Sequence, residues 1–151
     1  MQMIWLSEQF VRWLNWIAPF VRRSRVEDIS TEELRALLEQ DDESFVLVDV
    51  RSQSERDVSQ IPGAISMDEF WLQRDDLQNR TVIASCTVGG RSLLFAQRCL
   101  QNGIQARNYR PGILGWCEAG GELVNPHGQP TRRVHTHNKL LRAPDGYESV
   151  P

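Results

Sequence analysis

The protein has 151 residues, of which 40% are hydrophobic and 25% charged, and its net charge is −3 at neutral pH. A chain of this length forms one domain with extensions and can bury a substantial core. Basic residues prevail in residues 1–25 and 131–151, and acidic residues prevail in residues 26–130. An acidic body argues against nucleic acid as a partner of the globular part. The three cysteines lack disulfide or zinc spacing, which favours a reducing, cytoplasmic location.

Residues 3–21 are the first predicted element, an amphipathic helix. At roughly 100° per residue, its large apolar side chains fall on about half of the circumference. Glu8, Arg12 and Asn15 lie opposite and interrupt the apolar run, so we expect neither a membrane-spanning helix nor a secretory signal. The apolar face carries three tryptophans and arginines follow it, which is typical of a helix lying on the inner face of a membrane. The alternative is that this face packs on a second subunit or on its own domain.

From residue 25 onward, predicted strands alternate with predicted helices. Ser30 and Glu33 form a capping box at the start of a helix, and residues 45–50 are apolar on both faces, as central parallel strands are. We predict strands at residues 24–30, 45–50, around 65, 81–85 and 105–109, and helices after residue 30 and at 54–58, 68–76, 92–102 and 113–119. This alternation predicts an α/β domain with a mainly parallel sheet of about five strands flanked by helices.

Residues 86–92, with the sequence Cys-Thr-Val-Gly-Gly-Arg-Ser, lie between a predicted strand and a predicted helix. Backbone N–H groups and the positive end of the helix dipole then point at the sulfur of Cys86, which lowers its pKa. Gly89 and Gly90 permit the positive φ angles of a tight anion-binding loop. We therefore predict that Cys86 is a nucleophile, the alternative being an ordinary buried cysteine.

Residues 126–151 form a polar tail punctuated by proline and glycine, which we expect to be extended or partly disordered. His135 and His137 lie in this tail, where we expect no specific metal site. No histidine precedes residue 127, so we expect no Cys–His pair within the domain. The predicted organisation is therefore an N-terminal helix with a basic linker over residues 1–24, a domain over residues 25–125, and the tail.

Four motifs occur in the order and spacing of the rhodanese family of sulfurtransferases. Residues 47–51, Leu-Val-Asp-Val-Arg, resemble that family's Asp-x-Arg motif, and residues 61–65 resemble its Ile-Pro-Gly-Ala turn. Residues 86–92 match its active-site loop, and residues 111–116 resemble its closing Gly-Gly-x-x-x-Trp element. The resemblance covers residues 25–125. It departs at residues 59–60, where Ser-Gln replaces the usual Gly-His, and at Pro111, which replaces a glycine.

This resemblance implies a three-layer rhodanese-like domain and a sulfurtransferase that needs no cofactor or metal. Cys86 would accept sulfur from a small donor such as thiosulfate or a persulfide, and a thiol or an acceptor protein would remove it. The resemblance also assigns substrate-binding residues in the loop, namely Thr87, Val88, Gly89, Gly90, Arg91 and Ser92. It assigns loop-bracing residues on the preceding strand and helix, namely Asp49, Arg51 and Glu55. For Arg91 it favours an ion pair with Asp49 or Glu55 over binding of the donor's anionic end.

Two other functions are alternatives to sulfur transfer. Phosphatases with a cysteine loop place five residues between cysteine and arginine, whereas only four separate Cys86 from Arg91, and a smaller ring suits one sulfur atom better than phosphate. The second alternative is a rhodanese-like fold that serves as a binding or membrane-scaffold module, against which the intact Cys86 argues. We expect Cys99 and Cys117 to be structural, the alternative being that one of them resolves the persulfide by forming a disulfide.

Overall fold

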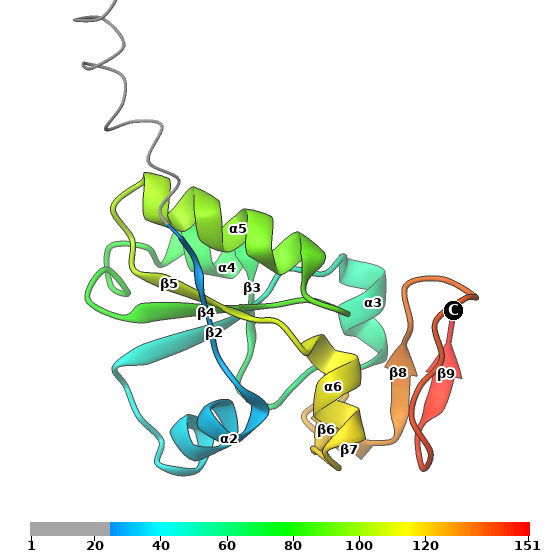
Figure 1. Ribbon diagram of the computed structural model, residues 1–151. Helices are drawn as coiled ribbons and strands as arrows, with labels where there is room; N and C mark the ends of the chain where they lie inside the picture. The colour runs from blue at the N-terminus through cyan, green and yellow to red at the C-terminus, as the bar shows by residue number, and fades with distance from the viewer. Residues whose placement is uncertain (1–24) are drawn as a thin grey trace, which may run out of the picture.

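The computed structural model describes residues 25–151, which form three layers around a parallel five-stranded sheet (Figure 1). The order of strands across the sheet is β1-β5-β4-β2-β3, with β4 in the centre. These strands are β1 (Glu27–Asp28), β2 (Phe45–Asp49), β3 (Ile65–Ser66), β4 (Thr81–Ser85) and β5 (Ala106–Tyr109). The predicted α/β class and parallel sheet are confirmed, and the amphipathic helix predicted at residues 3–21 lies outside the described residues.

Within residues 25–151, five helices flank the sheet, and three of them begin with a capping box. They are α2 (Thr31–Glu39), α3 (Gln53–Val58), α4 (Met67–Leu72), α5 (Gly90–Gln101) and α6 (Gly112–Glu118). In α2, α3 and α4 an N-cap serine accepts a hydrogen bond from the backbone of a glutamate three residues later, and that glutamate accepts one in return. Helix α5 has no such cap, because Gly89 precedes it in the left-handed conformation. Its first turn is therefore free to face the cysteine loop.

The sheet is buried on both faces, which is why its central strands are almost entirely apolar. Val46 and Val48 of β2 face α4 and α5, whereas Leu47, between them, faces α2 and α6 (Figure 1). Phe70 and Phe95 complete the first of these two cores. Strands held from both sides give a rigid platform for the loops at their ends.

The register of the sheet brings the loops after β2 and β4 together. Asp49, the last residue of β2, pairs with Ser85, the last residue of β4. The backbone N–H of Val50 then donates to the carbonyl of Ser85 at 2.9 Å. The carboxyl ends of neighbouring parallel strands meet at one edge of the sheet, where open α/β proteins place their sites.

The C-terminal segment is largely extended, which is one of the two outcomes expected from its composition. It contains β6 (Leu123–Val124), β7 (Pro130–Thr131), β8 (Arg133–His135) and β9 (Glu148–Val150), with β8 and β9 paired in parallel. Residues 132–150 are called the C-terminal strap below. Val134 is fully buried against the core that contains α2 and α6, and the Tyr147 hydroxyl donates to the Gly121 carbonyl at 2.7 Å. A few apolar anchors therefore hold this polar segment against the domain.

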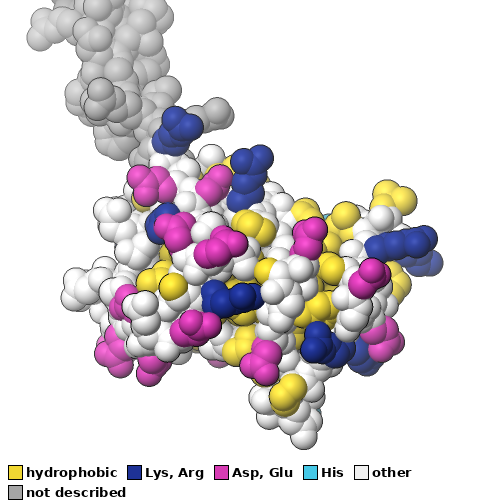
Figure 2. All heavy atoms as spheres, turned by 60° about the horizontal axis from the view of Figure 1, so that its bottom comes forward, with side chains coloured by type: hydrophobic (Ala, Val, Ile, Leu, Met, Phe, Trp, Pro, Cys, Tyr) yellow, Lys and Arg dark blue, Asp and Glu magenta, His cyan; other side chains and the backbone are white. Residues whose placement is uncertain are grey.

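The charge on the surface of the described domain is mixed. Figure 2 shows one face on which both acidic and basic side chains surround a central group of exposed hydrophobic side chains. Within residues 25–151, every helix is too short or too polar to cross a bilayer.

Candidate active site

Cys86 directly follows the central strand β4, and its side chain is buried. The backbone N–H of Gly89 donates to its Sγ at 3.0 Å, and the hydroxyl of Ser92 donates to the same atom at 3.3 Å. Both donors lie at the junction between the loop and α5. The sulfur therefore lies at the start of a helix, where N–H groups favour a negative charge.

The pKa of Cys86 is lower than that of an ordinary cysteine. Burial alone would raise this pKa, but hydrogen bonds from the Ser92 hydroxyl and from the loop's backbone N–H groups outweigh burial. A lowered pKa increases the thiolate fraction near neutral pH, and the thiolate is the nucleophilic form. Cys86 is thus poised for covalent chemistry although no histidine contacts it in the described part of the chain.

Two glycines allow the loop to pack against its neighbours. Gly89 has φ +89°, and a side-chain carbon there would collide with the carbonyl of Arg110. Gly112 has φ +65°, and a side-chain carbon there would collide with the carbonyls of Thr87 and Cys86. This close approach lets the N–H of Ile113 donate to the Cys86 carbonyl at 2.8 Å. The loop therefore packs directly against the start of helix α6, which fixes its position.

Arg91 of the loop is paired with Glu55 of α3. Its two terminal nitrogens each donate to a different carboxylate oxygen of Glu55, both at 2.8 Å. The Thr87 hydroxyl donates to Glu55 at 3.3 Å and accepts from Arg91 at 2.9 Å. Burial would raise the pKa of Glu55, but hydrogen bonds from Arg91 and from Ser52 hold it well below its usual range. Glu55 is therefore ionised and joins α3 to the loop.

Asp49 and Arg51 lie beside this pair but bond mainly to each other. The Arg51 guanidinium donates to both carboxylate oxygens of Asp49 at 2.7–3.2 Å and to the Ser59 carbonyl at 2.7 Å. Both side chains are buried. Among the residues described, Glu55 is the one of these three that bonds to side chains of the cysteine loop.

The remaining loop residues are either exposed to solvent or form hydrogen bonds inside the protein. Val88 is 54% exposed, so the outer surface of the loop is apolar, and Gly90 is the first residue of α5. Ser92 is fully buried, and its hydroxyl also lies 2.7 Å from the Asn108 side-chain oxygen. The Asn108 amide donates to the Gly89 carbonyl at 3.3 Å, which fixes the orientation of that side chain. A hydroxyl has one proton, so Sγ and the Asn108 oxygen compete for it.

Sequence reasoning missed three residues of this site. Ser52 donates to Glu55 through its N–H and its hydroxyl, both at 2.8 Å, and its capping-box spacing was a readable signal. Asn108 is a polar residue at the carboxyl end of a buried strand, which is a weaker signal. His137 of the C-terminal strap has its Nδ1 atom 3.4 Å from Glu55 Oε1, and no local pattern indicates that contact.

The other two cysteines lie in the cores on opposite faces of the sheet. Cys99 of α5 and Cys117 of α6 are buried, and neither forms a disulfide. Burial raises the pKa of Cys99 to about 11 and that of Cys117 to about 12. At neutral pH both are therefore thiols.

Comparison with known proteins gives relatives that match these features. A sulfurtransferase from Allochromatium vinosum is 30% identical over 107 residues, which cover 68% of this chain and 99% of the relative. The structure of a thiosulfate sulfurtransferase from Pseudomonas aeruginosa is similar with a TM-score of 0.55 and 28% identity. That match covers 69% of this chain and 21% of the larger protein.

A structure from Rhodopseudomonas palustris, described as a protein of unknown function and possible tyrosine phosphatase, matches with a TM-score of 0.56 and 29% identity. The match covers 64% of this chain and 83% of that protein. The family model of the rhodanese-like domain matches residues 30–119, which include the cysteine loop and its Glu55 brace. The chain therefore belongs to the rhodanese-like family.

Proposed function

We propose that the protein transfers sulfane sulfur from a small anionic donor such as thiosulfate to a thiophilic acceptor, through a persulfide on Cys86. The observation that carries this proposal is the pair of hydrogen bonds to Cys86 Sγ from Gly89 and Ser92, which stabilise a thiolate in a loop closed by Arg91 and Glu55. The sulfurtransferase from A. vinosum supports the same reaction class.

The reaction has two displacement steps. The Cys86 thiolate attacks the outer sulfur of thiosulfate, a new S–S bond forms, and sulfite leaves with the electron pair of the broken S–S bond. An acceptor nucleophile, either a thiolate or cyanide in an assay, then attacks the outer sulfur and releases the Cys86 thiolate. The N–H groups of the loop, from Thr87 to Ser92, stabilise the anionic persulfide between these steps.

The arrangement of Arg91 favours sulfur over phosphate. A phosphate ester in a cysteine loop needs a guanidinium that is free to donate two hydrogen bonds to it. Both terminal nitrogens of Arg91 are instead bound to Glu55, whose side chain is 3% exposed. The four-residue interval between Cys86 and Arg91 agrees with this preference. We therefore assign Arg91 and Glu55 to bracing the loop, whereas Asp49 and Arg51 bond to each other and to the Ser59 carbonyl.

The apolar outer surface of the loop bears on the choice of donor and acceptor. Val88 is exposed, and Arg91 is the one charged residue among residues 86–92. The loop thus attracts a dianion mainly through backbone N–H groups, and we infer modest turnover with thiosulfate and a protein persulfide or thiol as the physiological partner. A high catalytic efficiency with thiosulfate that does not change with salt concentration would contradict this inference.

The intact mass of the protein after incubation with thiosulfate tests the proposed function. The wild type and a Cys99→Ala control should gain one sulfur atom, and Cys86→Ser should gain none. Subsequent cyanide should remove that sulfur and produce thiocyanate. No gain in the wild type, with Cys86 still open to alkylation and with persulfide donors also tried, would instead support a binding or scaffold module.

The amphipathic pattern of residues 3–21 supports a peripheral position on the inner face of a membrane. The absence of disulfides among the three cysteines agrees with a reducing cytoplasm. The test is co-sedimentation with anionic vesicles, comparing the wild type with a variant in which Trp5, Trp13 and Trp16 are replaced by serine. Loss of binding in the variant supports the lipid surface, whereas a change from dimer to monomer without lipid binding supports a second subunit.

A further inference from the structure

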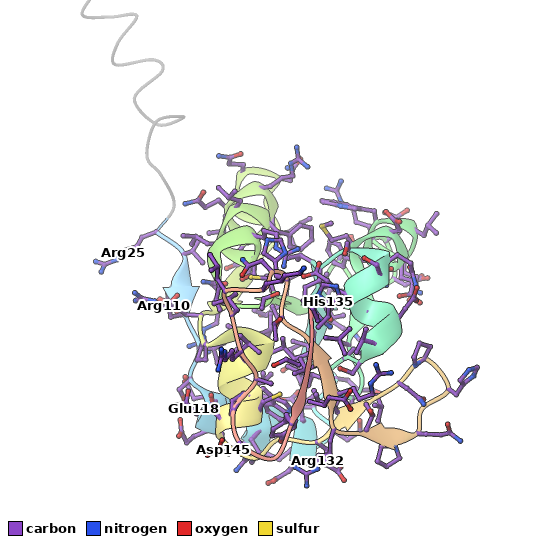
Figure 3. All side chains as sticks on the ribbon, turned by 90° about the vertical axis from the view of Figure 1, so that its right-hand side faces the viewer. Arg25, Arg110, Glu118, Arg132, His135 and Asp145 are labelled. Atoms are coloured by element: carbon purple, nitrogen blue, oxygen red, sulfur yellow. The ribbon has the colours of Figure 1, made fainter. Side chains whose placement is uncertain are left out.

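The C-terminal strap passes beside the active site although it lies outside the residues that match the family model. Strand β8 packs against α3, the helix that carries Glu55, and Figure 3 shows His135 of β8 close to this helix. Val134 and Thr136 are fully buried. The Thr136 N–H donates to the Val150 carbonyl at 2.8 Å, and its hydroxyl donates to the Asn138 carbonyl at 3.1 Å. The residue between Thr136 and Asn138 is therefore held firmly in place.

That residue, His137, has an unusual backbone conformation. Its φ is +72°, and within residues 25–151 the only other non-glycine residue with a positive φ is Asp41. A side chain other than glycine is strained in this region, and such strain persists where the surrounding structure requires it. The N–H of His137 donates to His135 Nδ1 at 3.0 Å, which helps to fix the turn.

The turn points the imidazole of His137 at Glu55. His137 Nδ1 lies 3.4 Å from Glu55 Oε1, the same oxygen that accepts from Arg91 at 2.8 Å and from Thr87 at 3.3 Å. The Glu55 side chain is 3% exposed, whereas that of His137 is 50% exposed. His137 therefore covers the side of the carboxylate that faces the strap and solvent.

We propose that His137 is a positioning residue of the active site, whose imidazole holds the Glu55 carboxylate in place for Arg91 and Thr87. This inference rests on the proposed function and concerns the same site. His137 acts through Glu55 and not on the sulfur. Thr87 directly follows Cys86 in the chain, so a shift of the carboxylate moves the residue next to the nucleophile. The strap thereby adds a contact to the Glu55 carboxylate that comes from outside the residues matched by the family model.

The imidazole holds the carboxylate in place by keeping water away from it. An ion pair open to water is screened and its side chains sample several geometries. Arg91 is already 36% exposed, so the carboxylate's low exposure is what keeps this pair ordered. Without the imidazole, water reaches Glu55 Oε1 and competes with the hydrogen bonds from Arg91 and Thr87.

Three substitutions in the full chain distinguish the effect of the His137 side chain from that of its backbone conformation. His137→Gly removes the imidazole and adopts φ +72° without strain. His137→Asn tolerates the same backbone conformation and places an N–H donor where Nδ1 lies. Asp41→Gly is the matched control, because Asp41 has φ +48° and lies exposed in the turn between α2 and β2.

The first readout is the rate at which iodoacetamide alkylates Cys86, and the second is kcat and KM for thiosulfate. His137→Gly should lower the alkylation rate and kcat by about fivefold, as expected for losing one close polar contact to a charged group, and should leave KM within about twofold. His137→Asn should restore both rates to within about twofold of the wild type. Asp41→Gly should equal the wild type, and thermal unfolding of all three variants should show no loss of stability.

Wild-type rates in His137→Gly would overturn the proposal. Equal losses in His137→Gly and His137→Asn would also overturn it, because the loss would then not depend on an N–H donor facing Glu55. A fall in thermal stability that accompanies the slower rates would assign His137 to folding alone. Alkylation does not require sulfur transfer, so a wild type that gains no sulfur would refute the proposed function and still leave the role of His137 decided.

Discussion

Cys86, Cys99 and Cys117 are all buried, but their surroundings differ in one respect. Cys99 and Cys117 lie among apolar side chains, and burial raises the pKa of each. Cys86 lies at the start of α5, where hydrogen bonds from Gly89 and Ser92 reach its sulfur and its pKa is lowered. Burial alone therefore does not determine thiol reactivity. The direction of the pKa shift depends on whether N–H and O–H donors point at the sulfur.

The largest expected effect is the contrast in alkylation between these cysteines. Thiols with pKa values of about 11 and 12 are ionised at pH 7 to about one part in ten thousand or less. Iodoacetamide at pH 7 should therefore modify Cys86 at least about a hundredfold faster than Cys99 or Cys117 in the folded protein. Peptide mass spectrometry over time measures the three rates. Similar rates would show that the loop does not activate Cys86.

The next prediction concerns the donor closest to the sulfur. In Gly89→Ala the new side-chain carbon collides with the Arg110 carbonyl and the left-handed backbone is strained, so the N–H moves away from Cys86. Alkylation of Cys86 should slow by roughly a hundredfold, as expected from losing a hydrogen bond to a charged sulfur together with its alignment. Gly128→Ala, at a glycine with positive φ and open space around it, is the control for backbone strain alone.

A third prediction uses the ion pair of Glu55 and Arg91, which joins α3 to the cysteine loop. Replacing Glu55 by glutamine leaves the Arg91 charge without its partner and should lower the free energy of unfolding at pH 7 by about 2 kcal/mol, because Arg91 is partly exposed. Urea unfolding of both proteins measures this difference.

The same pair of proteins gives a pH dependence. The pKa of Glu55 is lowered by folding, so its stabilisation is complete above the unfolded value of about 4.3 and is lost as the pH falls toward the folded value. The stability difference between wild type and Glu55→Gln should therefore be constant from pH 6 to pH 8 and shrink steadily below about pH 4. A constant difference down to pH 3 would contradict the lowered pKa.

Among the changes discussed at the cysteine loop and its ion pair, Ser92→Ala has the smallest expected effect. Removing one hydroxyl donor from a charged sulfur should slow alkylation of Cys86 at pH 7 by roughly tenfold and move its pH dependence to higher pH. The pH dependence of thiolate absorbance in the ultraviolet checks the same shift in the Cys99→Ala background. An unchanged profile would leave the backbone N–H groups as the main source of activation.

Local patterns in the sequence predict most of the fold. The capping box at Ser30 and Glu33, the apolar strand at residues 45–50 and the strand at residues 81–85 all appear in the structure near their predicted bounds. These signals involve neighbours in the chain, so they can be read without tertiary information. The helix predicted at residues 68–76 ends at Leu72 and continues as turns, a boundary that depends on packing.

The parts of the site that were not predicted depend on contacts between distant segments. Asn108 holds Ser92 from a neighbouring strand, and His137 reaches Glu55 from the strap. The sequence predicts that no histidine lies near the site, because residues 126–151 are treated as a tail separate from the domain. Val134 anchors that tail through a single buried side chain, which composition averages conceal.

Because Cys86 Sγ and the Asn108 oxygen share the Ser92 proton, the hydrogen bonding of the Asn108 side chain depends on the charge of the sulfur. When Cys86 is a thiolate, the charged acceptor draws the hydroxyl proton toward Sγ and away from the Asn108 oxygen. In the proposed Cys86 persulfide the negative charge lies on the terminal sulfur, so the proton returns to the Asn108 oxygen. The nuclear magnetic resonance frequencies of the Asn108 side-chain amide should therefore differ between the unloaded and loaded enzyme, giving a non-destructive record of sulfur occupancy during turnover.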